Sequence, residues 1–331
     1  MFLKNLQKHF AILQKHGVVA DSLFTVPPTP IVERYIRQYL VPVVNLLPAR
    51  TRYASTALLK KVRNFHGKLQ LHYPSDFQGW QLISEEIKGL ELRPWWEKRA
   101  VVCLCHDIDN LQGYHFTARM AEIDAQYGIQ STFNFLTHDY PIQNDLLTVL
   151  RENNFEIGLH GDTHDQGFAF RSPAAIQKRL TRSLDRLQGH DIVGYRSPAL
   201  SISHHLLRIL GQMNFVYDST MQIASSFYYS VQLPYPYYLE QFGIWEIPLM
   251  VQDDNYVRDT RTSEHEIFRS LQRFLTEIIP MNGVLVINAH PHLMVNRQKF
   301  YENFVRYLTR FSGHVAFVSM KAVIEYGCEH S

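Results

Sequence analysis

Cysteine is scarce in this chain, and the few cysteines present form no metal-binding or disulfide pattern. There are three in 331 residues, at Cys103, Cys105 and Cys328, with no CxxC pair among them. An odd number without paired spacing does not make the disulfide framework of a small secreted domain. A reducing compartment is therefore the easier interpretation.

Long apolar runs are also missing. Near the N-terminus Lys4, Lys8 and Lys15 interrupt every apolar stretch, so the sequence does not predict a secretory signal. The most apolar early stretch, residues 39–49, is too short to span a bilayer and contains two prolines. We therefore expect a cytoplasmic protein, and peripheral contact with the inner membrane face stays open.

An excess of one charge is absent from the whole chain but present in its first part. The formal net charge is +2, and we expect no nucleic-acid partner. Residues 1–70 contain 11 Lys and Arg against 2 Asp and Glu, a local charge of about +9, while the remainder is acidic. This distribution favours contact with something anionic, such as an acidic membrane surface. The alternative is a basic face that is only solvated.

Apolar sequence is plentiful: hydrophobic residues make up 46% of the chain, enough for a sizeable core. Residues 1–98 are predicted to form a basic, mainly helical accessory region, because Leu3, Leu6 and Phe10 recur at near-helical spacing. From residue 99 the texture changes to short runs of β-branched and aromatic residues between helical stretches. We therefore predict two parts, 1–98 and 99–331.

Strands that alternate with helices predict a parallel sheet. Seven or eight such units in about 230 residues predict an α/β fold of the distorted (β/α)7–8 barrel type rather than an open sheet. The predicted strands are 100–106, 130–136, 155–160, 192–196, 215–218, 244–249, 284–290 and 314–319. The predicted helices include 116–127, 173–188, 204–213 and 264–279.

Polar side chains stand where these predicted strands end. Asp107 and Asp109 follow the first strand, and His160 ends the third. The carboxyl ends of the strands of a (β/α) barrel meet at one mouth, where the chemistry takes place. We therefore expect these side chains to converge with those at three later strand ends, Arg196, Asp218 and His290.

The two aspartates suit a metal and a base. Residues two apart on extended backbone share a face, so Asp107 and Asp109 can both point into the mouth. Neighbouring carboxylates repel each other unless a cation separates their roles, with one holding a metal while the other accepts a proton. For this pair alone, the alternative is a strand-end turn whose aspartates face water.

His160 and His164 have the spacing of a metal-binding pair. Histidines four apart can share a face and bind one Zn²⁺ through neutral ring nitrogens. The spacing alone is a weak signal, because 17 histidines in 331 residues predict about one such pair by chance. Its place at a strand end favours a metal site over capping or surface histidines.

The remaining three residues each have a catalytic and a structural interpretation. Arg196 can form a bidentate pair with a carboxylate, lowering its pKa and fixing its orientation, or can be a surface arginine before a proline turn. Asp218 offers a carboxylate whose natural partner is a histidine. His290 fits a general acid, although a lone histidine is more often structural.

The five motifs follow one another in the order HDID (106–109), HGDTH (160–164), YRSP (195–198), YDST (217–220) and NAHPH (288–292). This set resembles the NodB-homology polysaccharide deacetylases, carbohydrate esterase family 4, over roughly residues 99–331, in the branch with a spaced aspartate pair. The resemblance implies a metal triad of Asp109, His160 and His164. It also implies a base, Asp107, an arginine that orients it, Arg196, a carboxylate that tunes the acid, Asp218, and the acid itself, His290.

The chain departs from the usual family pattern at several positions. Ile108 separates the aspartates, and His106 stands where an aromatic residue is usual. Ala199 and Thr220 replace an aromatic residue and a tryptophan that we expect in the wall of the substrate groove. These two changes put a polymeric chitin-like or peptidoglycan substrate in doubt, but not the hydrolytic machinery.

The resemblance implies a hydrolase that removes an N-acyl group, first of all N-acetyl, from a sugar of a polysaccharide or glycan intermediate. Zn²⁺ is the expected ion, with Co²⁺, Ni²⁺, Mn²⁺ or Fe²⁺ as alternatives; the residues alone argue only for metal-assisted amide hydrolysis. The enzymatic alternatives are a deformylase or deacetylase of a lipid-linked sugar and an allantoinase-like hydrolase of a small amide. A catalytically inactive glycan-binding module is the alternative of a different class.

Overall fold

The computed structural model describes residues 95–223, 230–231, 234–253 and 263–329. The predicted accessory region lies outside these residues, apart from its last four, so its helical character and its boundary stay predictions. Across the described ranges, no helix combines the length and the apolar character needed to cross a bilayer.

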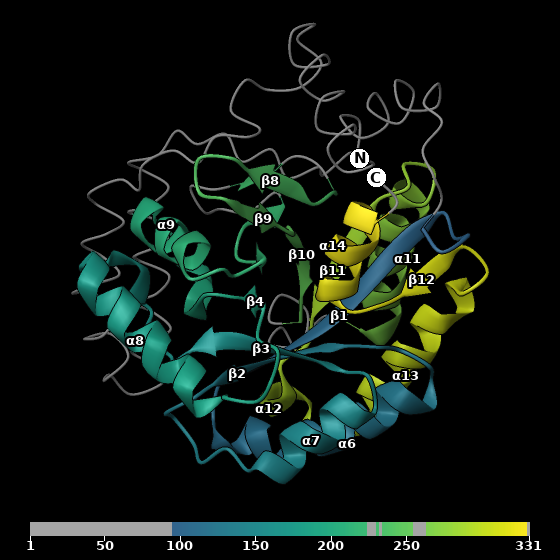
Figure 1. The fold of residues 1–331 in the computed structure, drawn as a ribbon. Helices are drawn as coiled ribbons and strands as arrows, with labels where there is room; N and C mark the ends of the chain where they lie inside the picture. Colours follow the sequence, from purple (N-terminus) through teal and green to yellow (C-terminus); the bar gives the residue numbers. More distant parts are fainter. Residues whose placement is uncertain (1–94, 224–229, 232–233, 254–262, 330–331) are drawn as a thin grey trace, which may run out of the picture.

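The predicted alternation of strands and helices is present (Figure 1). The helices are α6 (Leu111–Gln126), α7 (Asn144–Glu152), α8 (Pro173–Arg186), α9 (His204–Gln212), α11 (Glu264–Ile278), α12 (Pro291–Met294), α13 (Gln298–Leu308) and α14 (Met320–Glu329). The parallel strands are β1 (Ala100–Ile108), β2 (Thr132–Leu136), β3 (Glu156–Gly161), β4 (Gly194–Tyr195), β5 (Tyr217–Asp218), β6 (Gln222–Ile223), β7 (Ser230–Val231), β9 (Ile244–Glu246), β10 (Leu249–Gln252), β11 (Val284–Asn288) and β12 (Val315–Phe317). One further strand, β8 (Tyr237–Leu239), pairs antiparallel with β9.

Helix α11 shows how the sequence sets these elements. Ser263 and Glu266 form a capping box, in which each side chain accepts a hydrogen bond from the other residue's backbone N–H. Ile267, Leu271 and Leu275 recur every four residues and are buried against the sheet. The cap fixes where the helix begins, and the apolar stripe fixes the face that it turns to the core.

The strand pairings lead round a barrel. In one direction from β1 they run through β2, β3, β4 and β5 to β9, and in the other through β11 and β10 to β6. β5 and β6 lie along one stretch of chain, and β9 and β10 along another. Hydrogen bonds from Ile247 N to Asp218 O (2.9 Å) and from Leu249 N to Met221 O (2.8 Å) join these stretches, so the path returns on itself. The predicted distorted (β/α)7–8 barrel is confirmed.

Alternation along β1 separates an outer from an inner core. Ala100, Val102 and Leu104 belong to the core between sheet and helices, whereas Val101, Cys103 and Cys105 belong to a second core inside the barrel. β11 follows the same rule, with Leu285 and Ile287 outside and Val284 and Val286 inside. Residues of α14 complete the inner core: Met320, Val323 and Ile324.

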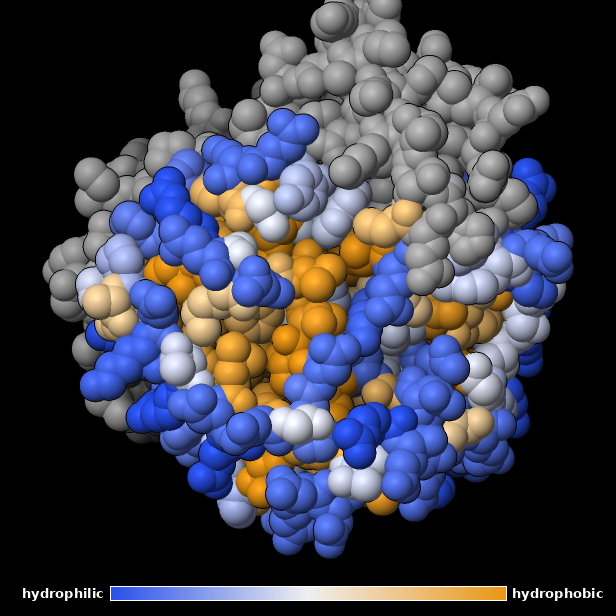
Figure 2. Space-filling view, in the orientation of Figure 1, coloured by the Kyte–Doolittle hydropathy of each residue, from blue (hydrophilic) through white to orange (hydrophobic). Residues whose placement is uncertain are grey.

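The surface reflects this layering. Figure 2 shows apolar side chains gathered in the middle of one face, over the strands, with hydrophilic side chains around the rim, where the helices lie. Since the inward-facing rows of β1 and β11 are apolar along most of their length, polar residues near their carboxyl ends stand out. Those residues form the site.

Candidate metal centre and proton-transfer site

The inward row of β1 continues into the two predicted aspartates. Residues 101, 103 and 105 face the inner core, so Asp107 and Asp109 face the same way at the barrel mouth. Asp107 is buried, and Asp109 is partly exposed. The predicted sharing of a face is therefore what the backbone produces.

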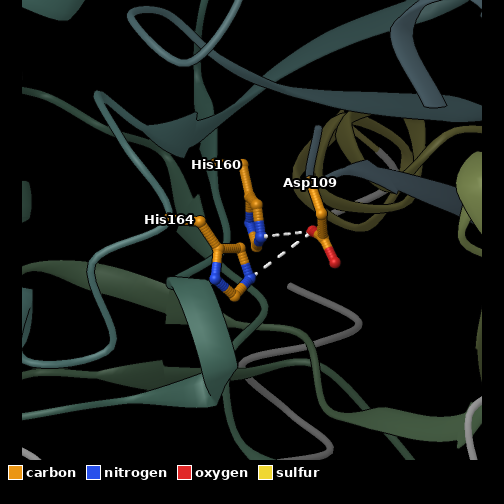
Figure 3. Close-up of side chains that lie close together, drawn as sticks. All are labelled: Asp109, His160 and His164. Atoms are coloured by element: carbon orange, nitrogen blue, oxygen red, sulfur yellow. Dashed lines mark ion pairs between the residues drawn. The ribbon is translucent and has the colours of Figure 1, made fainter. Parts of the chain in front are cut away.

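Asp109, His160 and His164 lie together at this mouth (Figure 3). The Nε2 atoms of His160 and His164 are 3.3 and 3.6 Å from the same oxygen, Oδ1 of Asp109. One ligand atom from each residue lies within 4.8 Å of the other two. Three donors of these types at this spacing match an open metal site, in which further positions are left for water and substrate.

Two further observations fit a cation here. The Nδ1 atom of His160 lies 2.8 Å from the carbonyl oxygen of Arg196, which can only accept, so Nδ1 carries a proton and the neutral ring presents its lone pair on Nε2. Asp109 Oδ1 is buried and accepts no hydrogen bond from any residue that the structure describes. A lone pair and an unsatisfied carboxylate oxygen that face each other are what a metal ion would bind.

The loop that carries His164 is fixed from behind. Arg179 donates from Nε to Asp162 Oδ1 at 2.8 Å and from Nη1 to Asp165 Oδ2 at 2.6 Å, and Arg182 also donates to Asp162. Asp162 is nearly fully buried, so this ion-pair network is partly desolvated and geometrically defined. The His164 N–H donates to Asp139 Oδ2 at 2.7 Å, which holds the loop from the other side.

Asp107 is held in its ionised form. Asn134 Nδ2 donates to its Oδ1 at 2.8 Å, and Asn288 Nδ2 donates to its Oδ2 at 2.7 Å. Burial alone would raise the pKa of the Asp107 carboxyl, but nearby positive charge, that of Arg196 first, outweighs burial and lowers the pKa below its usual value. Gly158 makes room for this arrangement, because a Cβ there would lie 2.2 Å from Asn134 Oδ1.

Arg196 lies beside Asp107 without forming the bidentate pair that was one of its two interpretations. Its guanidinium is fully buried, with Nη1 3.8 Å from Asp107 Oδ2. The Nε and Nη2 atoms instead donate to the backbone oxygen and hydroxyl of Ser219 at 2.8 and 2.7 Å, and Nη1 donates to Cys105 Sγ at 3.0 Å. The expected fork on a carboxylate was wrong; Arg196 acts on Asp107 as a nearby charge.

His290 has a carboxylate partner, but not the predicted one. Its Nδ1 donates to Asp253 Oδ1 at 2.6 Å, and its backbone N–H donates to Asp253 Oδ2 at 2.7 Å. Its Nε2 lies 3.8 Å from Asp109 Oδ2, and His292 Nδ1 lies 3.9 Å from the same oxygen. The carboxylate that orients His290 is therefore Asp253.

Asp218 lies elsewhere, on the outer side of the sheet. Its neighbour Tyr217 belongs to the inner core, so Asp218 points the other way, where Thr220 Oγ1 donates to it at 2.6 Å. Burial raises the pKa of the Asp218 carboxyl to about 6, beside the equally buried Glu246. The role expected for Asp218, tuning the acid, does not match this position.

Three residues of the site were given no role from the sequence: Asp253, Asn134 and Asn288. Asp253 follows β10, which ends at Gln252, whereas the predicted strand stopped at residue 249. Asn134 and Asn288 are amides on inward rows of β2 and β11, and amides carry no charge signal. The predicted strand 244–249 covers β9 and only the first residue of β10, so the rule of polar residues at strand ends would have found Asp253 had β10 been predicted to its end at Gln252.

Behind the site, His106 joins four elements. Its Nδ1 donates to the carbonyl oxygen of Ala289 at 2.8 Å, and its Nε2 lies 2.9 Å from Asp124 Oδ2 in α6. Tyr301 in α13 donates to Asp124 at 2.5 Å. The histidine that departs from the family pattern thus fixes the loop before His290 from the outer side of the sheet.

Comparison with known proteins agrees with this geometry. A family model described as WbmS-like polysaccharide deacetylase matches residues 105–306. No curated protein sequence matches the chain. Among solved structures, the chain is similar to a protein described as a polysaccharide deacetylase from Mycobacterium smegmatis, with 19% identity, a TM-score of 0.58, and coverage of 72% of this chain and 94% of that one.

Two other structures show the same fold. The allantoinase PuuE is 13% identical, with a TM-score of 0.57 and coverage of 70% of this chain and 91% of that chain. A protein from Pseudomonas aeruginosa PAO1 described as a polysaccharide deacetylase is 12% identical, with a TM-score of 0.55 and coverage of 70% and 92%. At these identities the likeness concerns the fold alone, and the family match carries the assignment.

Proposed function

This chain belongs to the polysaccharide deacetylase family, hydrolases of carbon–nitrogen bonds other than peptide bonds, and from that premise we propose that it removes an N-acyl group, first of all N-acetyl, from an amino sugar in a metal-dependent reaction. The observation that carries the proposal is the convergence of Asp109, His160 and His164 beside the hydrogen-bonded carboxylate of Asp107. The bond hydrolysed is the amide, and the products are a carboxylate and a free amine.

The metal would be held by Asp109, His160 and His164, and we propose Zn²⁺, which favours such nitrogen and oxygen ligands. When bound, it supplies Lewis-acid polarisation of the acyl carbonyl and makes water more acidic. Co²⁺, Ni²⁺, Mn²⁺ and Fe²⁺ suit the same donors and are separated from zinc by metal analysis of the purified protein.

Asp107 acts as the general base in this proposal. Two amide donors hold its carboxylate in one orientation, and its lowered pKa keeps it ionised at neutral pH, ready to take a proton from the attacking water. Arg196 supports the ionised form through its buried positive charge. General base catalysis of this kind contributes about 10² to 10⁴ in rate.

His290 acts as the general acid that protonates the leaving nitrogen. Because its Nδ1–H already donates to Asp253, the proton it gives must be on Nε2, which faces the mouth beside Asp109. A carboxylate on Nδ1 stabilises the imidazolium and fixes the ring, as a general acid requires. Asp107 and His290 together move the proton from water to the amine.

The substrate proposal is an N-acylated sugar of a glycan intermediate rather than a chitin-like polymer. Ala199 is partly exposed and offers no aromatic face for a sugar ring. Thr220 is buried and hydrogen-bonded to Asp218 and to the Ser197 N–H, so it lines no groove. Of the two missing aromatic residues, only the one at Ala199 therefore supports a substrate other than a chitin-like polymer.

We further propose that the protein works in the cytoplasm, with residues 1–70 in contact with an anionic membrane. The support is their charge of about +9, since basic residues near an acidic bilayer each contribute about 1 kcal/mol. Changing Lys60, Lys61 and Arg63 to Gln in the full chain should reduce sedimentation with acidic vesicles. Equal sedimentation of both proteins would contradict the docking proposal.

A substrate panel tests the activity. Metal-loaded protein and its Asp107→Asn variant are incubated with N-acetyl and N-formyl amino sugars, free and lipid-linked, and with allantoin, and the released acid is identified by mass spectrometry. We expect acid release from an acylated sugar, and we expect Asp107→Asn to lower its rate by about 10² or more. Turnover of allantoin alone would replace the sugar proposal, and no turnover of any compound would favour an inactive binding module.

A further inference from the structure

A groove on the outside of the barrel has the lining of an anion site. Helices α11 and α13 lie side by side there (Figure 1), and a hollow of about 400 Å³ runs between them. Three arginines line it, Arg269 from α11, Arg306 from α13 and Arg310 from the turn that follows, and no carboxylate does. Its volume is in the range of small-molecule sites.

Neutral groups hold the three guanidiniums in place. Arg269 Nη2 lies 2.7 Å from Nε2 of His265, and Arg306 Nη2 donates to Asn303 Oδ1 at 2.7 Å. The guanidinium of Arg310 lies 5.4 Å from the ring centroid of Tyr307, a cation–π distance. The arginines are therefore positioned without being neutralised.

Stacked aromatic rings join the two helices in the lining of the groove. Phe268 and Tyr307 stack with ring centroids 4.8 Å apart and planes 8° apart, and this contact ties α11 to α13. The ring of Tyr307 also contacts the ring of Phe311, edge to face, and the guanidinium of Arg310. Gln272 adds an amide to the lining and accepts a hydrogen bond from the Tyr307 hydroxyl at 3.4 Å.

Other arginines of the barrel are neutralised, in contrast. Arg119 pairs with Glu122, and Arg179 and Arg182 pair with Asp162. Within the part of the chain that the structure describes, none of Arg269, Arg306 and Arg310 forms an ion pair with a carboxylate. Like charges gathered in a hollow repel each other, and an anion between them removes the repulsion.

Helix electrostatics explain only part of this arrangement. Arg306 lies in the last turn of α13, where the helix dipole favours a cation. Arg269 lies in the second turn of α11, near the end where the dipole favours anions. Arg269 attracts Glu266, three residues earlier on α11, but forms no ion pair with it, and a ligand shared with Arg306 would supply a closer partner.

We propose that this groove binds a phosphate group, presented either by a soluble phosphate ester or by the headgroup of an acidic lipid. Guanidinium groups match the oxygens of phosphate in geometry and charge, and the amide of Gln272 and the imidazole of His265 can add donors. The site is separate from the catalytic mouth and needs neither the metal nor the proposed deacetylation.

Calorimetric titration with inorganic phosphate tests the site in the full, metal-loaded chain. We expect saturable binding in about the millimolar range that weakens as salt rises. The double variant Arg269→Ala/Arg306→Ala should bind at least about 10-fold more weakly, since it loses two of three charges. Arg119→Ala is the matched control, because it also removes an exposed helix arginine, but one already paired with Glu122.

Vesicle sedimentation distinguishes the two sources of the phosphate group, a lipid headgroup and a soluble ester. If phosphate binding depends on the groove and vesicles containing phosphatidic acid retain the wild type better than the double variant, the ligand is a lipid headgroup. If phosphate binding depends on the groove but both proteins sediment alike, the ligand is a soluble ester. The proposal is overturned if phosphate does not bind, or binds equally to the double variant and to Arg119→Ala, with thermal unfolding of all three proteins unchanged.

Discussion

The histidines on the two sides of Asp109 differ in the group that their second ring nitrogen contacts. On the β3 side, His160 and His164 face Oδ1 at 3.3 and 3.6 Å, and on the β11 side, His290 and His292 face Oδ2 at 3.8 and 3.9 Å. The Nδ1 of His160 donates to a neutral backbone carbonyl, whereas the Nδ1 of His290 donates to the carboxylate of Asp253.

This difference in partner divides the chemistry. A carbonyl on Nδ1 fixes the tautomer in which the lone pair that can bind a metal lies on Nε2, while a carboxylate on Nδ1 stabilises the protonated ring. In the proposed mechanism, the carboxylate of Asp109 therefore lies between a metal-binding half and a proton-transfer half. The partner of the remote ring nitrogen, rather than the histidine itself, assigns each role.

The β3 side should give the largest effect. His160→Ala or His164→Ala should lose stoichiometric metal and nearly all turnover, because two remaining ligands are too few to hold a divalent ion in an open site. Elemental analysis of the purified variants measures this, with the exposed His115→Ala as the control. Full metal content together with full turnover in either variant would show that the metal is bound elsewhere.

On the β11 side, His290→Ala should keep its metal and lose turnover by about 10² to 10⁴, the contribution of general acid catalysis. The comparison with His160→Ala is direct, since both changes remove one imidazole from the surroundings of Asp109. Metal content and acid release are measured on the same preparations. If His290→Ala lost the metal as fully as His160→Ala does, the division of the site into two halves would be wrong.

Between the halves, Asp107→Asn should retain the metal and lose turnover by about 10² or more, because an amide cannot take the proton from water. The fold should tolerate the change, since Asn134 and Asn288 can reorient their amides toward it. Asp109→Asn provides the contrast and should weaken metal binding. The reverse pattern, in which Asp107→Asn loses the metal and Asp109→Asn keeps it, would exchange the two roles.

The pH dependence of turnover distinguishes Asp253 from Asp218 as the carboxylate partner of His290. Asp253→Asn should lower turnover roughly 10²-fold and move its alkaline limb to lower pH, because the imidazolium loses the carboxylate that stabilises it. Asp218→Asn should leave that limb in place. A shift with Asp218→Asn and none with Asp253→Asn would restore the role first expected for Asp218.

Asp218 should instead influence stability. Burial raises the pKa of its carboxyl in the folded protein from 3.8 to about 6, so the folded state binds the proton more tightly than the unfolded state. Its contribution is therefore present below about pH 4 and is lost as the pH rises through about 6. Urea unfolding of Asp218→Asn should show a smaller fall in stability over this interval than the wild type.

We expect the smallest effect on the site from a change to Arg179, which supports the loop that follows β3. Arg179→Lys keeps the charge beside Asp162 but cannot reproduce the fork that joins Asp162 to Asp165. We expect metal affinity to fall about 10-fold, with turnover preserved at saturating metal. Competition with a chelating indicator measures the affinity. Arg171→Lys, at the exposed edge of the same network, is the control, and equal affinities in the two variants would mean that the loop needs no such support.

The sequence alone was sufficient for the parts that depend on periodicity. The alternation along β1 placed Asp107 and Asp109 on one face, and the strand ends gathered His160, Arg196 and His290 at one mouth. These rules are local, because the side-chain period of a strand is two wherever the strand lies. The fold class followed from the same alternation at a coarser scale.

The sequence alone could not predict which carboxylate pairs with His290. β5 has only two residues, so nothing in the pattern fixed which of Tyr217 and Asp218 faces inward. The structure turns Tyr217 inward, where its hydroxyl donates to Glu156, and this sends Asp218 to the other side. The partner that His290 has instead, Asp253, depends on the length of β10, and strand ends are the least certain feature of a sequence pattern.

The alternation of β1 makes the spacing between its residues as important as their identity. Deletion of His106 would leave both aspartates in the chain but turn them toward α6, where the first would take the place of His106 beside the carboxylate of Asp124 and neither would face the barrel mouth. Removal of two residues of β1 before Asp107 would restore the direction of both aspartates but shorten the strand. Among variants with residues inserted into or deleted from β1, those with an even change in length should therefore keep more activity than those with an odd change.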